Sequence, residues 1–422
     1  MLVTKGRGVF YKTPPFSDFP GGEFARRVET ARKYMARKEI DVLVLWDEHN
    51  IRYFSGFNCM HWDAKSLQCA ILILPLDHDP VIICPEFFRG TVEATTYIQD
   101  IRGYESPHHL PTLRGLPLEV VRVIKDIGCG RTRIGIEDGD AANMYIPRPR
   151  SDIEAFCSEF RDATIVGAAE VIWQCRMIKS ELEIEAMRTA CALITEAFSE
   201  FVENFSLGMS EREAGASLYS AIVRRGLISH GWYFVGDPQR HGMVDTHPSY
   251  EGVPMNRGNH VVVECFGSYK GYRGGVGRCL DIGEISKKKW EFIEATEYGQ
   301  DAALASIRDG VVAHDILKAM QEAFAEKGFT RSFAGHGAGL TGHEPPALTN
   351  SETMVIRKGM ILAIEIWIFD QEGYTRGGRI NMAPGEGLTN LGQFGMEEFV
   401  VVTEDGYEML PTFPREIRTI PH

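Results

Sequence analysis

Short apolar runs alternate with stretches of helical periodicity over roughly the first 165 residues of the chain. Between residues 23 and 38, apolar side chains recur at spacings of three and four, which predicts a helix. The β-branched runs that follow are too short for helices and are typical of buried strands. The pattern places strands at 40–46, 67–74, 80–84 and 133–137, and a second helix at 118–127. Strands and helices in alternation predict an α/β domain.

Two capping signals open the second half of the chain. Ser180 with Glu183, and Ser210 with Glu213, form the pattern in which two side chains satisfy backbone N–H groups at a helix start. These helices should end near residue 205 and before Gly226. Further helices are predicted at 287–308 and 313–327, and strands at 261–264, 272–280, 361–369, 399–403 and 407–410. This pattern predicts a layered α+β domain, and hence two domains, 1–168 and 169–422.

The composition excludes several classes of function. The 422 residues carry 45 Lys and Arg against 58 Asp and Glu, a net charge of −13 that disfavours nucleic acid as a partner. No apolar run approaches the roughly 18 residues of a membrane span, and residues 1–20 lack the apolar core of a secretory signal. The nine cysteines are scattered without a C-x-x-C pair, so reduced thiols and a cytoplasmic location are expected.

Acidic residues within apolar strands are the first candidates for chemistry. Glu365 interrupts the run ILAIEIWIF, and Glu397 lies in the apolar run MEEFVVV. A buried carboxylate costs several kcal/mol unless it is paired, protonated or bound to a metal. Glu365 is therefore either half of a buried ion pair or part of a functional site. His336 lies in the segment GHGAG, where the backbone can approach a ligand closely, although such a histidine is also common as a structural residue.

The order of these segments resembles the pita-bread family, which includes methionine aminopeptidase, aminopeptidase P, prolidase and creatinase. The resemblance rests on residues 245–248, the hairpin that ends at Arg278, the GHGAG segment with His343 behind it, and the two acid-bearing strands. Residues 50–57 and 176–180 also look like parts of the family's amino-terminal domain and of the entry to its catalytic domain. The resemblance implies an α/β creatinase-like amino-terminal domain, an α+β pita-bread domain and a homodimer.

Peptidases of this family hold two metal ions with Asp, Asp, His, Glu and Glu. The last three positions correspond here to His336, Glu365 and Glu397. Glu264 stands where the resemblance implies the first Asp, and Gly275, eleven residues on, where it implies the second. Bridging carboxylates hold two like-charged ions about 3.5–4 Å apart, so a two-metal cluster is not expected. The alternatives are one Mn, Fe or Zn ion on the three retained ligands, with or without Glu264, and no metal at all.

Two histidines match the proton-handling positions that the resemblance implies. His247 lies 17 residues before Glu264, which is the family's spacing, and histidine titrates near neutral pH. It is expected to act as general acid or base, the alternative being a simple turn residue. His343 lies seven residues after His336 and is expected to orient substrate. With Glu365, these two histidines make up the expected catalytic set.

Four residues are expected to contact the substrate. Glu264 would bind a cationic group of the substrate. Trp62, in a loop that reaches a partner's active site in this family, would form an aromatic wall or else pack at the dimer interface. Arg376 and Arg379 would bind a substrate carboxylate, or would pair with the retained acids.

Glycines at two positions separate the chain from its best-known relatives. Gly277 stands where creatinase carries an extra glutamate, and Gly395 where the peptidases often carry an arginine. We therefore expect a non-peptidase hydrolase of the creatinase-like branch, which cleaves a C–N bond in a small cationic or zwitterionic metabolite with His247 as general acid or base. The alternatives are a metal-dependent Xaa-Pro dipeptidase or aminopeptidase, a single-metal enzyme similar to dimethylsulfoniopropionate lyases, and a non-enzymatic peptide-binding module.

Overall fold

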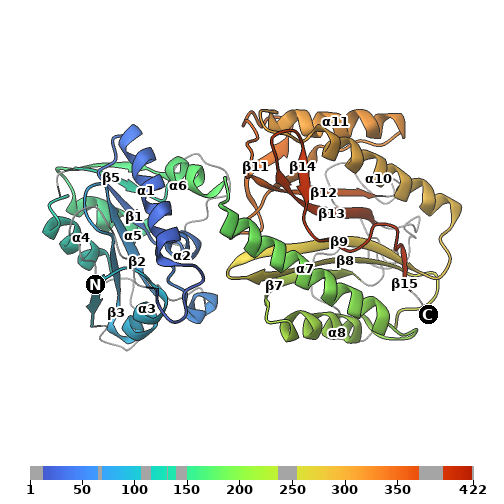
Figure 1. The fold of residues 1–422 in the computed structure, drawn as a ribbon, viewed down its shortest axis with the longest axis horizontal. Helices are drawn as coiled ribbons and strands as arrows, with labels where there is room; N and C mark the ends of the chain where they lie inside the picture. The colour runs from blue at the N-terminus through green and yellow to red at the C-terminus, as the bar shows by residue number, and fades with distance from the viewer. Residues whose placement is uncertain are drawn as a thin grey trace. The chain divides into compact units, whose positions relative to one another are not determined.

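The chain forms two compact units in the computed structural model, which describes residues 13–64, 69–105, 116–130, 132–138, 150–235, 254–369 and 393–420. Unit 1 comprises Met1–Arg176 and unit 2 comprises Met177–His422 (Figure 1). The boundary expected at residue 168 falls just before helix α6 (Ala169–Arg176), which packs against helix α1 (Gly21–Arg37) within unit 1. Among the described residues, no helix has both the length and the apolar character that crossing a membrane requires.

A six-stranded mixed sheet forms the centre of unit 1, in the order β4-β3-β2-β1-β5-β6. Its strands are β1 (Val42–Leu45), β2 (Ile71–Pro75), β3 (Val81–Pro85), β4 (Asp100–Tyr104), β5 (Arg133–Ile136) and β6 (Thr164–Gly167). Strands β1, β2 and β3 are buried along their whole length, as unbroken apolar runs predict. The four strands predicted in this domain are confirmed as β1, β2, β3 and β5, with ends shifted by a few residues.

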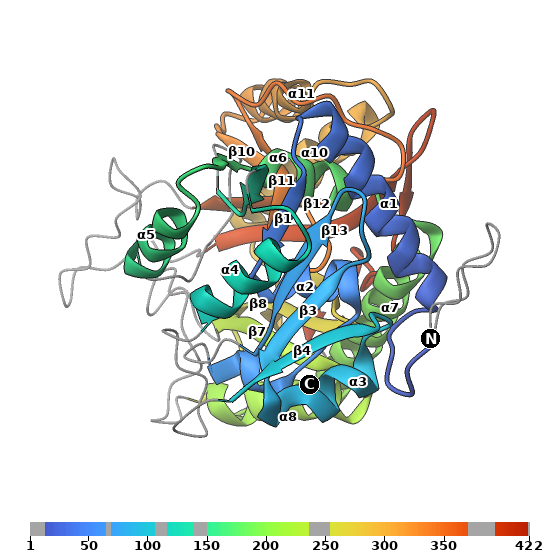
Figure 2. The same cartoon turned by 90° about the vertical axis from the view of Figure 1, so that its left-hand side faces the viewer.

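Helices flank this sheet. Helix α4 (Leu116–Asp126) packs its apolar side against β1, β2, β3 and β5, and in Figure 2 it lies near the labelled strands β1 and β3. The predicted helices at 23–38 and 118–127 are confirmed as α1 and α4. The other helical elements are α2 (Glu48–Ser55), α3 (Arg89–Thr95), α5 (Arg150–Glu159) and the 3-10 turns η1 (Met60–Ala64) and η2 (Glu86–Phe88).

A nine-stranded sheet forms the centre of unit 2. Its main order is β11-β10-β12-β13-β9-β8-β7, with β14 beside β13 and β15 beside β9. The strands are β7 (Ile228–Val235), β8 (His260–Tyr269), β9 (Tyr272–Ile282), β10 (Phe333–Gly337), β11 (Glu344–Thr349), β12 (Ile361–Phe369), β13 (Gln393–Val402), β14 (Tyr407–Met409) and β15 (Thr419–Ile420). Among the described residues, the strand pairings in this sheet are antiparallel except that of β15 with β9.

Two pairs of helices pack against the sheet of unit 2. Helix α7 (Glu181–Asn204) lies against β8 and β9, and α8 (Glu211–Arg224) against β7. Helix α10 (Lys287–Ser306) lies against β12 and β13, and α11 (Ala313–Glu326) against β10 and β11 (Figure 1). Both predicted capping boxes are confirmed, because Ser180 and Ser210 each accept from the third backbone N–H while Glu183 and Glu213 reach back.

A tight turn sets the register between β8 and β9. Its two central residues, Lys270 and Gly271, have φ values of 51° and 85°. Two successive positive φ angles match a type I′ turn, whose twist suits a hairpin. With this turn, Glu264 lies opposite Gly277. A slip of one residue would turn Glu264 to the opposite face of the sheet, so this turn helps to position the site.

Several strands of unit 2 differ from prediction, and β7 and β15 were not predicted. Strand β13 begins at Gln393 rather than near residue 399, and therefore includes Glu397. Strands β10 (FAGHG) and β11 (EPPALT) were not predicted, because glycine and proline are unfavourable in strands. Gly335 shows why β10 forms nevertheless: its φ is 133°, and a Cβ there would lie 1.9 Å from Ala363 O. The close pairing with β12 thus requires the glycine.

Candidate active site

Three acids lie in one row across the sheet of unit 2. Glu365 on β12 is the direct partner of Glu397 on β13. Glu397 is paired in turn with Gly277 on β9, and Gly277 with Glu264 on β8. The order along the row is therefore Glu264, Gly277, Glu397, Glu365. Glu264 and Gly277 precede Glu397 by more than a hundred positions in the sequence, and strand pairing makes them neighbours.

The row lies on the sheet face opposite the helices. On β8, Val263 and Cys265 pack into the core formed with helices α7 and α8, so Glu264 between them points to the other face. On β13, Phe394 packs against a phenylalanine of α10 at a ring distance of 5.0 Å. Glu397, three residues further, therefore points away from α10. Among the described residues these helices cover only the other face, so the acids share what we call the helix-free face.

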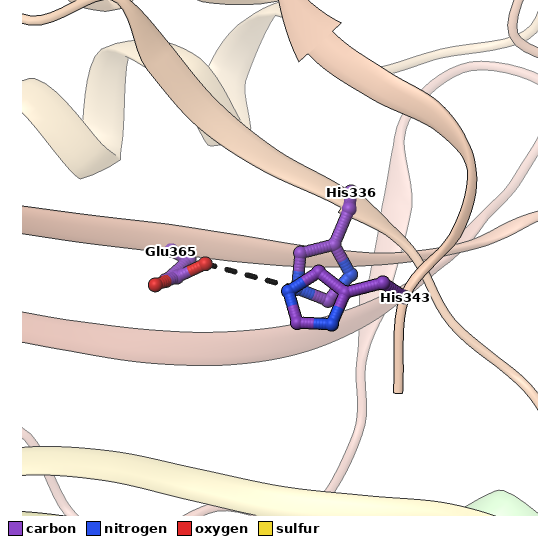
Figure 3. Close-up of side chains that lie close together, drawn as sticks. All are labelled: His336, His343 and Glu365. Carbon is purple, nitrogen blue, oxygen red and sulfur yellow. Dashed lines mark ion pairs between the residues drawn. The ribbon is translucent and has the colours of Figure 1, made fainter. Parts of the chain in front are cut away.

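His336 on β10 joins the row beside Glu365. It is paired with Ala363, two residues from Glu365, and its Nε2 lies 3.7 Å from Glu365 Oε2 (Figure 3). Its Nδ1 lies 2.9 Å from Gly337 O. Because a carbonyl can only accept, Nδ1 carries the proton and the Nε2 lone pair faces Glu365. Burial, with His343 nearby, lowers the pKa of His336 to about 4, so the ring is neutral at pH 7.

His343 approaches the same point from the loop between β10 and β11. Its ring centroid lies 3.9 Å from that of His336, and Figure 3 shows the two rings overlapping beside Glu365. Ligand atoms of His336, His343 and Glu365 all lie within 4.8 Å of one another. Partial burial of the ring and the nearby Arg273 lower the pKa of His343, although the residue as a whole is exposed. His343 thus adds a second imidazole to the expected metal ligands.

A buried ion pair holds the loop that carries His343. Lys179 Nζ lies 3.1 Å from Glu344 Oε2, and the two side chains are 2% and 1% exposed. Glu344 Oε1 also accepts from the backbone N–H and the hydroxyl of Thr341, both at 3.2 Å. Gly339 leaves room for this carboxylate, since a Cβ there would lie 2.7 Å from it. The ion pair therefore fixes the residue next to His343.

Trp367 is a site residue that the sequence analysis missed. Its Nε1 donates to Glu365 Oε1 at 2.8 Å, and its side chain is buried. The indole lies over two glycines: a Cβ at Gly395 would lie 2.1 Å from its ring, and one at Gly277 would lie 3.1 Å from it. Trp367 lies two residues after Glu365 in the same strand, so both side chains lie on one face of the sheet. This spacing is the sequence feature that could have identified Trp367 as a site residue.

Glu397 is the most buried acid of the row. Burial, and then the negative charges of Glu365 and Glu264, raise its pKa well above its usual value. Its neighbour Glu398 points to the other face, where Arg278 Nη2 donates to it at 2.8 Å. Two adjacent glutamates therefore have different roles, one in the candidate site and one in a structural ion pair.

An aromatic ring occupies the place of the second expected aspartate. Gly275 is paired with Phe266 on β8, and a Cβ at Gly275 would lie 2.2 Å from Phe266 Cδ1. A Cβ contact under 3.0 Å is not tolerated, so a side chain at position 275 requires the ring to move. The loss of the aspartate is thus accompanied by an aromatic ring that covers the glycine.

The geometry of these donors fits a divalent ion. Ligand atoms held at 2.0–2.2 Å from one ion lie roughly 3.0–3.5 Å apart, close to the 3.7 Å between His336 Nε2 and Glu365 Oε2. His343 offers a third ligand atom within 4.8 Å of these two, and Glu397 is the direct strand partner of Glu365. Nitrogen and oxygen donors of this kind suit Mn, Fe or Zn. A second ion would need a carboxylate where Gly275 lies beneath Phe266.

The remaining predicted residues are placed less directly. His247, Arg376 and Arg379 lie outside the described residues, so their roles stay predictions. Trp62 lies in η1 of unit 1, is 8% exposed, and packs edge-to-face with Phe57 at a ring distance of 4.9 Å. It therefore packs within its own unit, and a contact with substrate stays a prediction.

The chain matches two known protein families. Residues 185–404 match the Metallopeptidase family M24, and residues 27–178 match the Creatinase/Prolidase N-terminal domain. The first match alone covers more than half of the chain. The chain therefore belongs to metallopeptidase family M24, and the two-domain pita-bread fold expected from the sequence is confirmed.

Relatives of this family differ in what they act on. The probable dipeptidase PepE of Mycobacterium bovis is 31% identical over 260 residues, which cover 61% of this chain and 64% of that protein, less than two thirds of its length. The ectoine hydrolase of Halomonas elongata is 24% identical over 414 residues, which cover 94% of this chain and 98% of that protein. The crystal structure of an X-Pro aminopeptidase from Thermotoga maritima superposes with a TM-score of 0.74 at 22% identity, covering 93% and 99% of the two chains.

Proposed function

We propose that the chain is a hydrolase of the creatinase-like branch that cleaves a C–N bond in a small cationic or zwitterionic metabolite. One observation carries the proposal. Of the five ligand positions expected for a two-metal peptidase, one holds the longer Glu264 and one holds Gly275, which lies under the ring of Phe266. A carboxylate-rich face that lacks its second metal is suited to a substrate with its own positive charge.

The retained residues then divide into two roles. His336, His343 and Glu365, with Glu397 beside them, would hold one divalent ion, which when bound supplies a Lewis acid next to the scissile carbon. Trp367 and Gly337 would fix the orientation of Glu365 and of His336 through the hydrogen bonds described above. Glu264 would bind the cationic group at the other end of the row.

His247 is proposed as the general acid and base. It would take a proton from water as the water oxygen bonds to carbon, and would return a proton to the nitrogen as the C–N bond breaks. Histidine can perform both transfers near neutral pH. In the same proposal, Arg376 and Arg379 would bind a carboxylate of a zwitterionic substrate.

A substrate panel tests the proposal. Purified protein would be assayed with guanidino acids, cyclic amidines, N-acyl diamines and Xaa-Pro dipeptides, with and without chelator, beside His247→Ala. We expect turnover of a non-peptide substrate and a loss of about 100-fold or more in the variant, as for removal of a general base. Turnover confined to Xaa-Pro peptides would refute the proposed substrate class, and full activity of the variant would remove His247 from the mechanism.

A metal-dependent Xaa-Pro dipeptidase or aminopeptidase is the second candidate. It is favoured by the retained cluster of His336, His343 and Glu365, and by relatives that are named as dipeptidase and X-Pro aminopeptidase. Chelation should then abolish all activity, and proline-containing dipeptides should be the best substrates. An alkene product formed without consumption of water would indicate the lyase alternative, and binding of peptides without turnover would indicate a binding module. The homodimer and the cytoplasmic location stay predictions.

A further inference from the structure

The ring of Phe266 lies at the position that distinguishes this site most clearly from a two-metal centre. Phe266 and Glu264 are two residues apart on β8 and therefore share the helix-free face. Their partners on β9 are both glycines, Gly275 and Gly277. The space over Gly275 is therefore occupied by the Phe266 ring from β8, whereas Gly277 is contacted by Glu397 and by the indole of Trp367.

The surroundings of this ring are acidic and only partly shielded. Phe266 and Glu264 are both partly exposed, whereas Glu397, across Gly277 in the same row, is buried. The face of an aromatic ring attracts cations electrostatically, and more strongly where water is excluded. Carboxylates beside the ring add a charge-assisted hydrogen bond for N–H donors. A ring next to a carboxylate, with a second carboxylate further along the row, recognises a planar or alkylated organic cation better than a strongly hydrated metal ion.

We propose that Phe266, lying over Gly275 beside Glu264 and Glu397, replaces the second metal of the family with a binding subsite for an organic cation of the substrate, a guanidinium, amidinium or alkylammonium group. Phe266 is then a specificity-determining residue. This inference rests on the proposed function, since it names the part of the substrate that the acidic row would bind. It also makes two claims that are measurable without turnover: an organic cation binds here, and a second metal does not.

The first experiment measures cation binding by the full chain. N-methylguanidinium and its uncharged analogue N-methylurea would be titrated calorimetrically into wild type, Phe266→Leu and Phe266→Tyr. We expect the cation to bind more tightly than the urea. Phe266→Leu, which keeps apolar volume but loses the ring, should weaken the cation about 2- to 30-fold. Phe266→Tyr, which keeps the ring, should stay within about 2-fold of wild type. Equal affinities for cation and urea, or an unchanged Phe266→Leu, would overturn the subsite.

The second experiment restores the missing ligand. Mn²⁺ bound per chain would be measured by elemental analysis after equilibrium dialysis, for wild type, Gly275→Asp, Phe266→Ala and the double variant Phe266→Ala/Gly275→Asp. Wild type and both single variants should bind no more than one ion. Wild type and Phe266→Ala lack the carboxylate at position 275, and in Gly275→Asp the ring of Phe266 blocks that position. The double variant should bind one ion more than wild type. Two ions bound by wild type would contradict the inference directly.

Failure of the inference and failure of the proposed function can be told apart. If N-methylguanidinium binds through Phe266 but no C–N substrate is turned over, the subsite stands and the proposed reaction falls. If a cationic substrate is turned over with the same KM by wild type and Phe266→Leu, the reaction stands and the subsite falls. Circular dichroism of each variant distinguishes a loss of binding from a failure to fold, and Phe266→Tyr supplies the binding readout should Phe266→Leu not fold.

Discussion

Replacement of Lys179 by methionine should destabilise unit 2 strongly. The substitution keeps most of the side-chain volume but leaves the Glu344 carboxylate buried without its lysine, which lies 3.1 Å away in the native structure. At an effective dielectric constant of about 20, a charge pair at that distance interacts by about 5 kcal/mol. Removal of one partner of a buried pair costs about 3–5 kcal/mol. We therefore expect a loss of about 3–5 kcal/mol in the free energy of unfolding of unit 2.

The measurement must report on unit 2 alone, because two compact units need not unfold in one transition. Hydrogen exchange read by mass spectrometry over strands β10 and β12 meets this requirement. Lys358→Met is the matched control: its pair with Glu404 spans 3.5 Å but is 65% and 77% exposed, so its loss should cost at most about 1 kcal/mol. The reasoning fails if the two variants differ by less than 1 kcal/mol, and Lys179→Met with Glu344→Leu should recover part of the loss.

Three further perturbations address the row of acids and its support. Gly277→Ala places a Cβ 2.9 Å from Glu397 Cβ and should cost about 1–3 kcal/mol in urea denaturation. Trp367→Phe removes the donor to Glu365 Oε1 and should weaken Mn²⁺ binding about 10- to 100-fold in calorimetry. Burial opposes ionisation of Asp281, but hydrogen bonds from a buried histidine and lysine outweigh it and lower its pKa. Its contribution to stability is therefore present above about pH 4 and is lost as the pH falls further, and Asp281→Asn should reduce this acid-side loss in a thermal melt.

Each of these perturbations has a control elsewhere in the chain. Gly22→Ala in helix α1 meets no atom within 4 Å and should leave stability unchanged or slightly raised. Trp290→Phe, at an exposed position, should not change Mn²⁺ affinity. Asp315→Asn, whose side chain is 51% exposed, should leave the acid-side curve unchanged. If a test variant and its control changed stability or Mn²⁺ affinity equally, burial and contact would not determine these effects.

Local sequence signals predicted much of this fold. The two Ser-x-x-Glu boxes place helix starts because the capping hydrogen bonds lie within four residues of each other. The unbroken apolar runs of β1, β2 and β3 predict buried strands for an equally local reason. Strands β10 and β11 were missed, since their glycines and prolines are favourable only in contact with β12 and with each other.

The candidate site was predictable where one residue type carries the chemistry. Acids in apolar strands marked Glu365 and Glu397, and a histidine between glycines marked His336. The closeness of His343 to His336 and Glu365, and the hydrogen bond from Trp367, emerged from the structure. Both depend on how a loop and an indole ring lie in space, which spacing along the chain does not specify.

By itself, the sequence determined which chemical groups the protein has: three glutamates and two histidines in a defined order, and a glycine where an aspartate was expected. Tertiary structure alone decided that the ring of Phe266 covers that glycine and that Trp367 holds Glu365. The physical reason is that folding sets the distances between groups: strand register places Glu397 beside Gly277, more than a hundred positions away, and side-chain packing lays an aromatic ring over a glycine. A hydrogen bond or a steric clash depends on that distance and not on separation along the chain.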